Sequence, residues 1–135
     1  ARQYADKLGY DLVIVDKKRE KANESQVMNI IGDVTGKDVI LVDDMVDTAG
    51  TLVKAAEVLK EKGATSVMAC CTHGVLSGPA YDRVANGVLD ELVISDTIPT
   101  KKNAKKITVL TASTIIGEAI RRIHNNESVN SIFNN

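Results

Sequence analysis

Short apolar runs alternate along the chain with longer amphipathic segments. The runs are rich in β-branched residues and are bounded by charged or polar residues, which is typical of strands. They are Leu12–Val15, Val39–Val42, Ser66–Cys71, Leu92–Ile94 and Ile107–Leu110. Because these runs are continuously apolar rather than alternating, they predict a parallel sheet with helices on both faces.

The segments between the runs carry the 3.6-residue period of amphipathic helices. Helices are expected over Ala1–Leu8, Thr51–Lys62, Pro79–Ala85 and Ser113–His124. Gly63 stands where the C-cap of the helix over Thr51–Lys62 is expected. The alternation of strands and helices predicts an α/β fold with right-handed crossovers.

Two segments have a weaker pattern. Val27–Val34 is expected to form a strand and a turn. Lys17–Ser25 is polar and charged without a core pattern, which predicts a mobile loop. The chain begins with Ala1 rather than Met and enters a helical pattern at once, so we expect it to be a piece of a longer protein.

Composition narrows the class of protein. A length of 135 residues suits one domain, and 44% hydrophobic with 26% charged residues is typical of a globular chain. A net charge of −1 and 3% aromatic residues argue against nucleic acid as a partner. The apolar runs are shorter than the roughly 20 residues of a membrane span, so no membrane association is expected. Cys70 and Cys71 are adjacent, which favours reduced core thiols and a cytoplasmic location.

The segment with the clearest chemistry runs from Val39 to Thr51, with the sequence Val-Ile-Leu-Val-Asp-Asp-Met-Val-Asp-Thr-Ala-Gly-Thr. Its strand delivers Asp43 and Asp44 to the carboxyl end, where ligands bind in open α/β sheets. A turn of small residues follows, and a helix is expected to begin near Thr51.

This turn is suited to bind an anion. The first N–H groups of a helix have no intrahelical partner, and the helix dipole places partial positive charge there. The hydroxyls of Thr48 and Thr51 can add hydrogen bonds to a phosphate. The carboxylates of Asp43 and Asp44 accept hydrogen bonds, which suits vicinal hydroxyls or a hydrated magnesium ion. Together these groups describe a site for ribose 5-phosphate.

A purely structural interpretation also accounts for each residue taken alone. Asp43 and Asp44 would then end a strand, and Asp47 or Thr48 would cap the following helix. The combination is more specific than its parts, and its low glycine content separates it from the P-loop and the dinucleotide-binding pattern.

The segment resembles the phosphoribosyl-pyrophosphate binding motif of type I phosphoribosyltransferase folds. Further segments narrow the resemblance to the ribose-phosphate pyrophosphokinases, also called phosphoribosyl pyrophosphate synthetases. These segments are Val27–Val34, Cys70–Ala80, Glu118–His124 and Glu127–Phe133. The resemblance covers essentially all 135 residues and implies the C-terminal domain of a two-domain enzyme, whose N-terminal domain is absent from this sequence.

The resemblance also implies a reaction. It is transfer of the β,γ-diphosphoryl group of ATP to the 1-hydroxyl of ribose 5-phosphate, with Mg²⁺ as cofactor. Asp43 and Asp44 would face the ribose hydroxyls, or hold magnesium through water. The 5-phosphate would be held by five consecutive residues: Asp47, Thr48, Ala49, Gly50 and Thr51. The family forms homo-hexamers and takes its ATP contacts largely from the other domain, so the 135 residues alone are expected to be inactive.

The polar segment Asp16–Arg19 resembles the catalytic flexible loop of this family. Lys17 aligns with its catalytic lysine, and Arg19 aligns with an arginine that also contacts substrate. Cations at these positions would offset the negative charge of phosphoryl transfer. The family usually has arginine where Lys18 stands and often proline where Glu20 stands. Without the resemblance, such a basic loop would be ordinary solvated surface.

The end of the chain resembles the allosteric region of the family, where hydroxyls from neighbouring subunits bind phosphate or ADP. Ser128 fits this pattern, and Asn130 stands where a second serine is common. These two residues are therefore the expected allosteric positions.

Other interpretations stay open at this point. A catalytically silent homologue or sugar-phosphate sensor with the same fold would keep the phosphate motif, although it would have no need of Lys17 and Arg19. A signalling receiver domain also has acidic residues after a strand, but carries them near its start. A nucleobase phosphoribosyltransferase would share the motif but not the resemblance of the whole chain.

Overall fold

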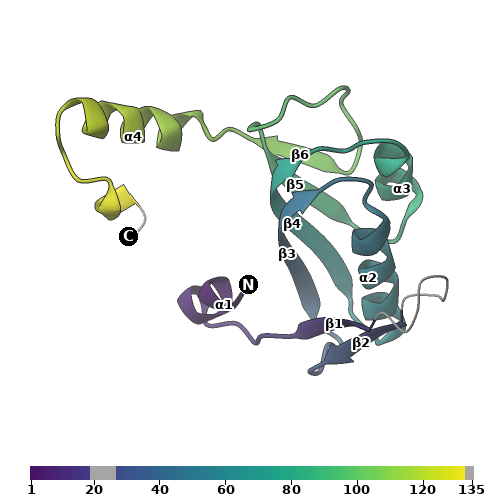
Figure 1. The fold of residues 1–135 in the computed structure, drawn as a ribbon. Helices are drawn as coiled ribbons and strands as arrows, with labels where there is room; N and C mark the ends of the chain where they lie inside the picture. Colours follow the sequence, from purple (N-terminus) through teal and green to yellow (C-terminus); the bar gives the residue numbers. More distant parts are fainter. Residues whose placement is uncertain (19–26, 133–135) are drawn as a thin grey trace.

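A parallel sheet forms the centre of the structure. The computed structural model describes residues 1–18 and 27–132. Its main sheet has four strands in the order β3 (Asp38–Val46), β4 (Ser66–Gly74), β5 (Glu91–Ser95) and β6 (Ile107–Leu110). Every adjacent pair in this sheet is parallel. The predicted α/β fold with a parallel sheet flanked by helices is therefore confirmed (Figure 1).

Two helices pack against one face of this sheet. They are α2 (Gly50–Glu61) and α3 (Ala80–Asn86), and both lie on the same side of the strands (Figure 1). Alternate residues of β4, namely Val67, Ala69 and Cys71, are buried on this face. The hydrophobic core thus lies between β4, β5 and these two helices, and it holds the carboxyl ends of β3 and β4 in place.

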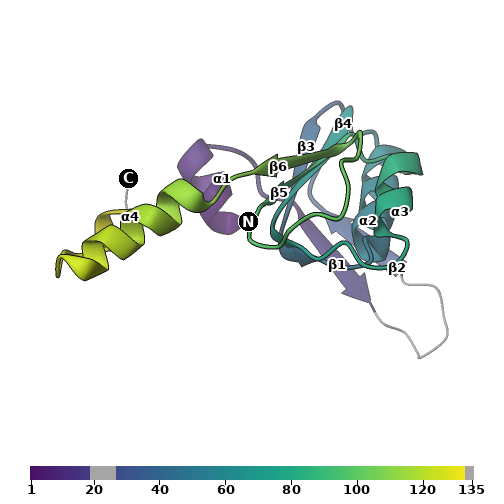
Figure 2. The same ribbon diagram turned by 90° about the horizontal axis from the view of Figure 1, so that it is seen from above.

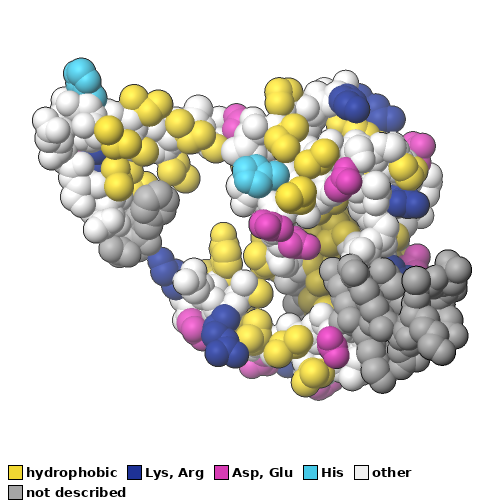
Figure 3. Space-filling model, in the orientation of Figure 1, with side chains coloured by type: hydrophobic (Ala, Val, Ile, Leu, Met, Phe, Trp, Pro, Cys, Tyr) yellow, Lys and Arg dark blue, Asp and Glu magenta, His cyan; other side chains and the backbone are white. Residues whose placement is uncertain are grey.

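The opposite face of the sheet is far less covered. Helix α1 (Arg2–Leu8) lies beside β3, and α4 (Ser113–His124) leads away from the sheet (Figures 1 and 2). Neither helix has a buried residue, and hydrophobic side chains remain visible on α4 (Figure 3). Ile40 of β3 is 54% exposed. No helix in the described ranges is long and apolar enough to cross a bilayer.

The first two strands form a separate pair. β1 (Ile14–Lys18) and β2 (Val27–Ile31) are antiparallel, with Ile14 opposite Ile31. The prediction that the loop begins at Lys17 was wrong, because β1 continues through Lys18. Pairing with a distant strand overrides the local polarity that suggested a loop. The rest of that predicted loop, 19–25, lies outside the described residues.

Strand β3 is longer than its apolar core. The apolar run ends at Val42, but the ladder with β4 continues to Val46. Asp43 is registered with Cys71, and Met45 with His73. Asp43 is therefore paired within the ladder, and Asp44 also lies inside β3 rather than in the loop that follows it.

The two cysteines confirm the prediction of reduced thiols. Both are free; Cys70 is half-buried and Cys71 is buried. Burial, with a smaller contribution from the carboxylate of Asp43, raises the pKa of Cys71 to about 11. Burial also raises the pKa of Cys70.

Candidate functional site

The acidic residues of the motif lie near the carboxyl end of β3. Asp43 and Asp44 are both exposed, and the Oδ1 atom of Asp43 accepts a 2.9 Å hydrogen bond from the backbone N–H of Asp44. Three residues, 47–49, separate the strand from α2, which begins at Gly50. The structure thus places two carboxylates and a helix N-terminus within one short segment.

The N-terminus of α2 is not capped by a side chain. Its N-cap is Ala49, so the expectation that Asp47 or Thr48 would cap this helix under the structural interpretation was wrong. The first backbone bond of the helix runs from the N–H of Val53 to the carbonyl of Ala49 over 3.0 Å. Among the described residues, no acceptor meets the N–H groups of Thr48, Ala49, Gly50 or Thr51. These donors are therefore available to an anion.

The turn before α2 contains a strained residue. Ala49 has φ 59° and ψ 5°, in the left-handed region, and its side chain is buried. For a residue with a Cβ atom this conformation costs on the order of 1–2 kcal/mol. Strain of this kind persists only where the surroundings enforce it, and it gathers at functional sites.

A second loop contacts this turn from the side of α3. The N–H groups of Leu76 and Ser77 donate to the carbonyls of Val46 and Asp47, each over 3.1 Å. The hydroxyl of Ser77 donates to the carboxylate of Asp47. Sequence analysis did not single out these contacts, because no motif connects two loops that lie about 30 residues apart in the chain.

Arg83 of α3 reaches the same turn. Its Nη1 atom donates to the carbonyl of Thr48 over 3.0 Å. The same atom lies 3.1 Å from the position that a Cβ atom on Gly50 would occupy. Arg83 was also missed by sequence analysis, since a single arginine on a short helix carries no recognisable signal.

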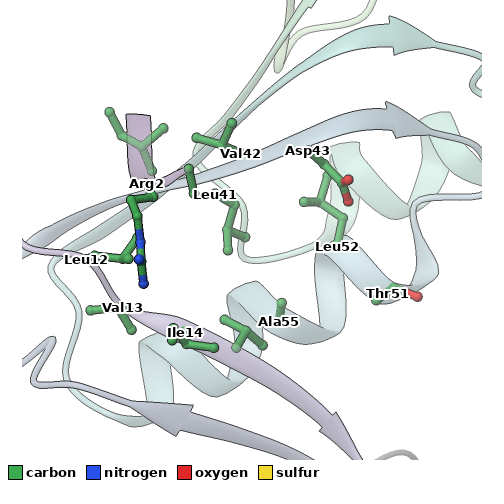
Figure 4. Close-up of a pocket in the computed structure, with 13 residues that line it drawn as sticks. Arg2, Leu12, Val13, Ile14, Leu41, Val42, Asp43, Thr51, Leu52 and Ala55 are labelled. Carbon is green, nitrogen blue, oxygen red and sulfur yellow. The ribbon is translucent and has the colours of Figure 1, made fainter. Parts of the chain in front are cut away.

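A pocket of about 370 Å³ adjoins the acidic strand end. Asp43 and Thr51 lie on one side of it and Arg2 on the other, with apolar residues such as Leu41 and Leu52 between them (Figure 4). The structure thus brings two of the predicted site residues to one cavity. Arg2 adds a cation that sequence analysis did not identify.

In the part of the chain that the structure describes, the remaining predicted site residues are not brought to this pocket. Lys17 belongs to β1, where its backbone is registered with Met28. Arg19 lies outside the described residues. Ser128 and Asn130 follow α4, and the N–H of Asn130 donates to the hydroxyl of Ser128 over 3.3 Å. This segment lies away from β3 in both views (Figures 1 and 2).

The acidic residues do not form a closed metal site. Within residues 1–18 and 27–132, no group of three or more His, Cys, Asp or Glu side chains is arranged to hold a metal ion. Asp43 and Asp44 are nevertheless exposed oxygen ligands. Such a pair fits Mg²⁺, which usually keeps several waters and takes its other ligands from substrate phosphates.

Comparison with known protein families shows the family to which this chain belongs. The sequence profile of the phosphoribosyl synthetase-associated domain matches residues 4–134. The chain belongs to the phosphoribosyl synthetase-associated domain family. This membership agrees with the resemblance of the whole chain noted from its sequence.

Curated relatives of this phosphoribosyl synthetase-associated domain include the ribose-phosphate pyrophosphokinases of Campylobacter jejuni and Wolinella succinogenes. They are 68% and 67% identical over 133 residues, covering 98% of the chain. The chain spans 43% of the length of each of these relatives. A crystal structure of phosphoribosylpyrophosphate synthetase from Mycobacterium smegmatis superposes with a TM-score of 0.84 at 38% identity, covering 93% of this chain and 41% of that one.

Proposed function

We propose that this chain is the ribose 5-phosphate-binding, C-terminal domain of a ribose-phosphate pyrophosphokinase. The observation that carries the proposal is the pair of exposed carboxylates of Asp43 and Asp44, followed by the uncapped N-terminus of α2, in a chain 68% identical to a curated enzyme of that name. The C-terminal position is supported by the resemblance of Glu118–His124 and Glu127–Phe133 to the family's ending.

In the proposed site, two groups of residues bind different parts of the substrate. Asp43 and Asp44 accept hydrogen bonds from the ribose hydroxyls, since ionised carboxylates act only as acceptors. The 5-phosphate is held by the turn that follows, through backbone N–H groups and the hydroxyls of Thr48 and Thr51. The proposed phosphate-binding residues are Asp47, Thr48, Ala49, Gly50 and Thr51. The carboxylate of Asp47 is turned toward Ser77, so its contribution is through the backbone.

The proposed chemistry is transfer of the β,γ-diphosphoryl group of ATP to the 1-hydroxyl of the bound sugar. Lys17 and Arg19 would offset the charge that gathers on the transferred group. Asp43 and Asp44 would hold Mg²⁺ through water, and the ion, when bound, would neutralise phosphate charge. Retention of both cations favours an enzyme over a catalytically silent sensor, which needs no such groups.

The whole protein is proposed to be a cytoplasmic homo-hexamer. ATP contacts come from an N-terminal domain in this proposal, because this chain spans only 43% of its curated relatives. Ser128 and Asn130 are proposed to contribute to an allosteric anion site between subunits. The 135 residues alone are accordingly expected to bind the sugar phosphate weakly and to form little AMP.

A calorimetric titration of the chain with ribose 5-phosphate and Mg²⁺ tests the site. Saturable binding that inorganic phosphate reproduces only in part would support a complete sugar-phosphate site within these residues. Asp43→Asn should weaken that binding, whereas Asp6→Asn, an exposed carboxylate on α1, serves as a control and should not. In the full-length enzyme, AMP release from ATP that depends on ribose 5-phosphate separates the enzyme from a sensor.

A further inference from the structure

The backbone conformation of the turn that we propose to bind the 5-phosphate is stabilised by contacts from outside the turn. Ala49 sits in the left-handed region without the freedom of glycine, and no side chain caps α2. Left to itself, such a turn would relax toward an ordinary conformation of lower energy. The contacts that prevent this come from outside the motif, and most of them come from α3 and the loop that precedes it.

Arg83 contacts the turn at the peptide that links Thr48 to Ala49. Its Nη1 atom donates to the Thr48 carbonyl over 3.0 Å. In a trans peptide the carbonyl and the following N–H point in opposite directions. Anchoring the Thr48 carbonyl to α3 therefore turns the N–H of Ala49 away from α3, and no acceptor among the described residues meets that N–H.

The small size of Gly50 lets Arg83 reach this position. A Cβ atom at Gly50 would lie 3.1 Å from Nη1 and 3.7 Å from the Cζ atom of Arg83. The glycine of the motif thus makes room for the guanidinium on one side of the turn while leaving the backbone open on the other. The guanidinium of Arg83 thus lies against the Thr48 carbonyl, on the α3 side of the turn.

The loop before α3 supports the same turn through a second set of bonds. Leu76, like Ala49, is buried with a positive φ of 48°. Its N–H and that of Ser77 bond to the carbonyls of Val46 and Asp47. Two strained loops therefore hold each other, and Arg83 is the charged link between α3 and the turn.

We propose that Arg83 is a positioning residue for the 5-phosphate turn. It fixes the Thr48–Ala49 peptide so that the backbone donors of the turn face the sugar phosphate, and it does so without touching substrate. This inference rests on the proposed function. It assigns to α3 a part in sugar-phosphate affinity that the binding motif alone does not contain.

Steady-state kinetics of the full-length enzyme test the proposal. Arg83→Leu should raise KM for ribose 5-phosphate roughly tenfold, the effect of losing one charge-assisted hydrogen bond at an exposed site. KM for ATP should change less than twofold. Arg83→Lys keeps a charge and one donor, so it should restore most of the affinity. A purely structural role would lower the amount of active enzyme and leave both KM values unchanged.

Lys106→Met is a matched control. Its ammonium group also donates to a backbone carbonyl over 2.8 Å, but this carbonyl belongs to Gly87, the C-cap residue of α3, and not to the turn. This variant loses a cation and a hydrogen bond of the same kind, and its KM for ribose 5-phosphate should stay within twofold of the wild-type value.

A double-mutant cycle with Gly50→Ala tests the contact from the other side. The new methyl group should displace Arg83, so Gly50→Ala should raise KM in the wild-type background and add little to Arg83→Leu. If Arg83→Leu does not fold, an unchanged KM for ribose 5-phosphate in Gly50→Ala would overturn the proposal. An unchanged KM in folded Arg83→Leu, together with a raised KM in Asp43→Asn, would overturn it while leaving the proposed function intact. Lack of AMP formation by the wild-type enzyme would instead refute the proposed function.

Discussion

Replacing Gly74 by alanine tests how tightly the end of β4 is packed. A Cβ atom at this position would lie 2.6 Å from Cδ1, 3.2 Å from Cγ2 and 3.3 Å from Cβ of Ile94. Rotating the end of the Ile94 side chain relieves only the first of these contacts. Ile94 is 1% exposed, so it cannot move out into solvent and any shift is made against its core neighbours.

Overpacking of this kind costs about 1–3 kcal/mol. In a chain of 135 residues, a loss of that size lowers the melting temperature by roughly 3–10 °C. Urea and thermal unfolding, followed by far-UV circular dichroism, measure the change; tryptophan fluorescence does not serve, because the chain has no Trp.

Gly117→Ala is the control for this experiment. Gly117 lies inside α4, and a Cβ atom there would meet nothing within 4 Å. Alanine should therefore stabilise this helix by about 0.5–1 kcal/mol, the usual gain in helix propensity. If Gly74→Ala unfolds at the wild-type urea concentration with an unchanged slope, Ile94 is not held as the structure shows and the argument fails.

Three further outcomes are expected. In the full-length enzyme, Thr51→Val should raise KM for ribose 5-phosphate several-fold and leave KM for ATP unchanged, as initial-rate kinetics would show. Lys17→Ala should lower kcat by at least tenfold with a smaller change in KM; equal losses in single-turnover rate and in binding would make Lys17 a binding residue only. Asp90→Asn should destabilise the chain at pH 7, because the N–H of Val67 and the ammonium of Lys60 lower the pKa of Asp90 below 3.8. A lowered pKa in the folded state stabilises above pH 3.8 and is lost as the pH falls through the folded value, so unfolding curves of the two proteins should converge in acid.

The hydrophobic pattern of the sequence predicted helices and strands well where the tertiary packing favours the same structure as the local sequence. Ile107–Leu110 and Ser113–His124 form β6 and α4 with the predicted bounds. The β-branched run and the amphipathic period each favour a single structure there. Helix α2 begins and ends one residue earlier than expected, so its C-cap is Lys62 rather than the predicted Gly63, which follows with a positive φ.

Features that depend on distant pairing could not be predicted in the same way. The extension of β3 through Asp43 and Asp44 follows from its ladder with β4, not from the polarity of those residues. The antiparallel pairing of Ile14 with Ile31 likewise depends on a tertiary contact. Aspartate is depleted in strands, but the pairing of β3 with β4 on its one paired side carries the strand past Asp43.

In the site, too, local sequence predicted some features, and others depend on distant contacts. The motif located the carboxylates and the turn, because the chemistry of a phosphate cradle demands those residue types in that order. It did not reveal Arg83, which lies 35 residues from Thr48 in the chain. It did not reveal the left-handed conformation of Ala49 either, since alanine is rarely found there.

The adjacent cysteines provide two reporters in neighbouring positions. Successive residues of a strand point to opposite faces, so Cys71 is buried under the helices and Cys70 faces the sparsely covered side. A thiol reagent would then modify Cys70 whenever that side is open, whereas Cys71 would react only when the helical side separates from the sheet. Labelling of the first cysteine would follow the docking of other protein surfaces against the sheet. Labelling of the second would follow unfolding of the domain. Both signals would come from the same chain, without any amino-acid substitution.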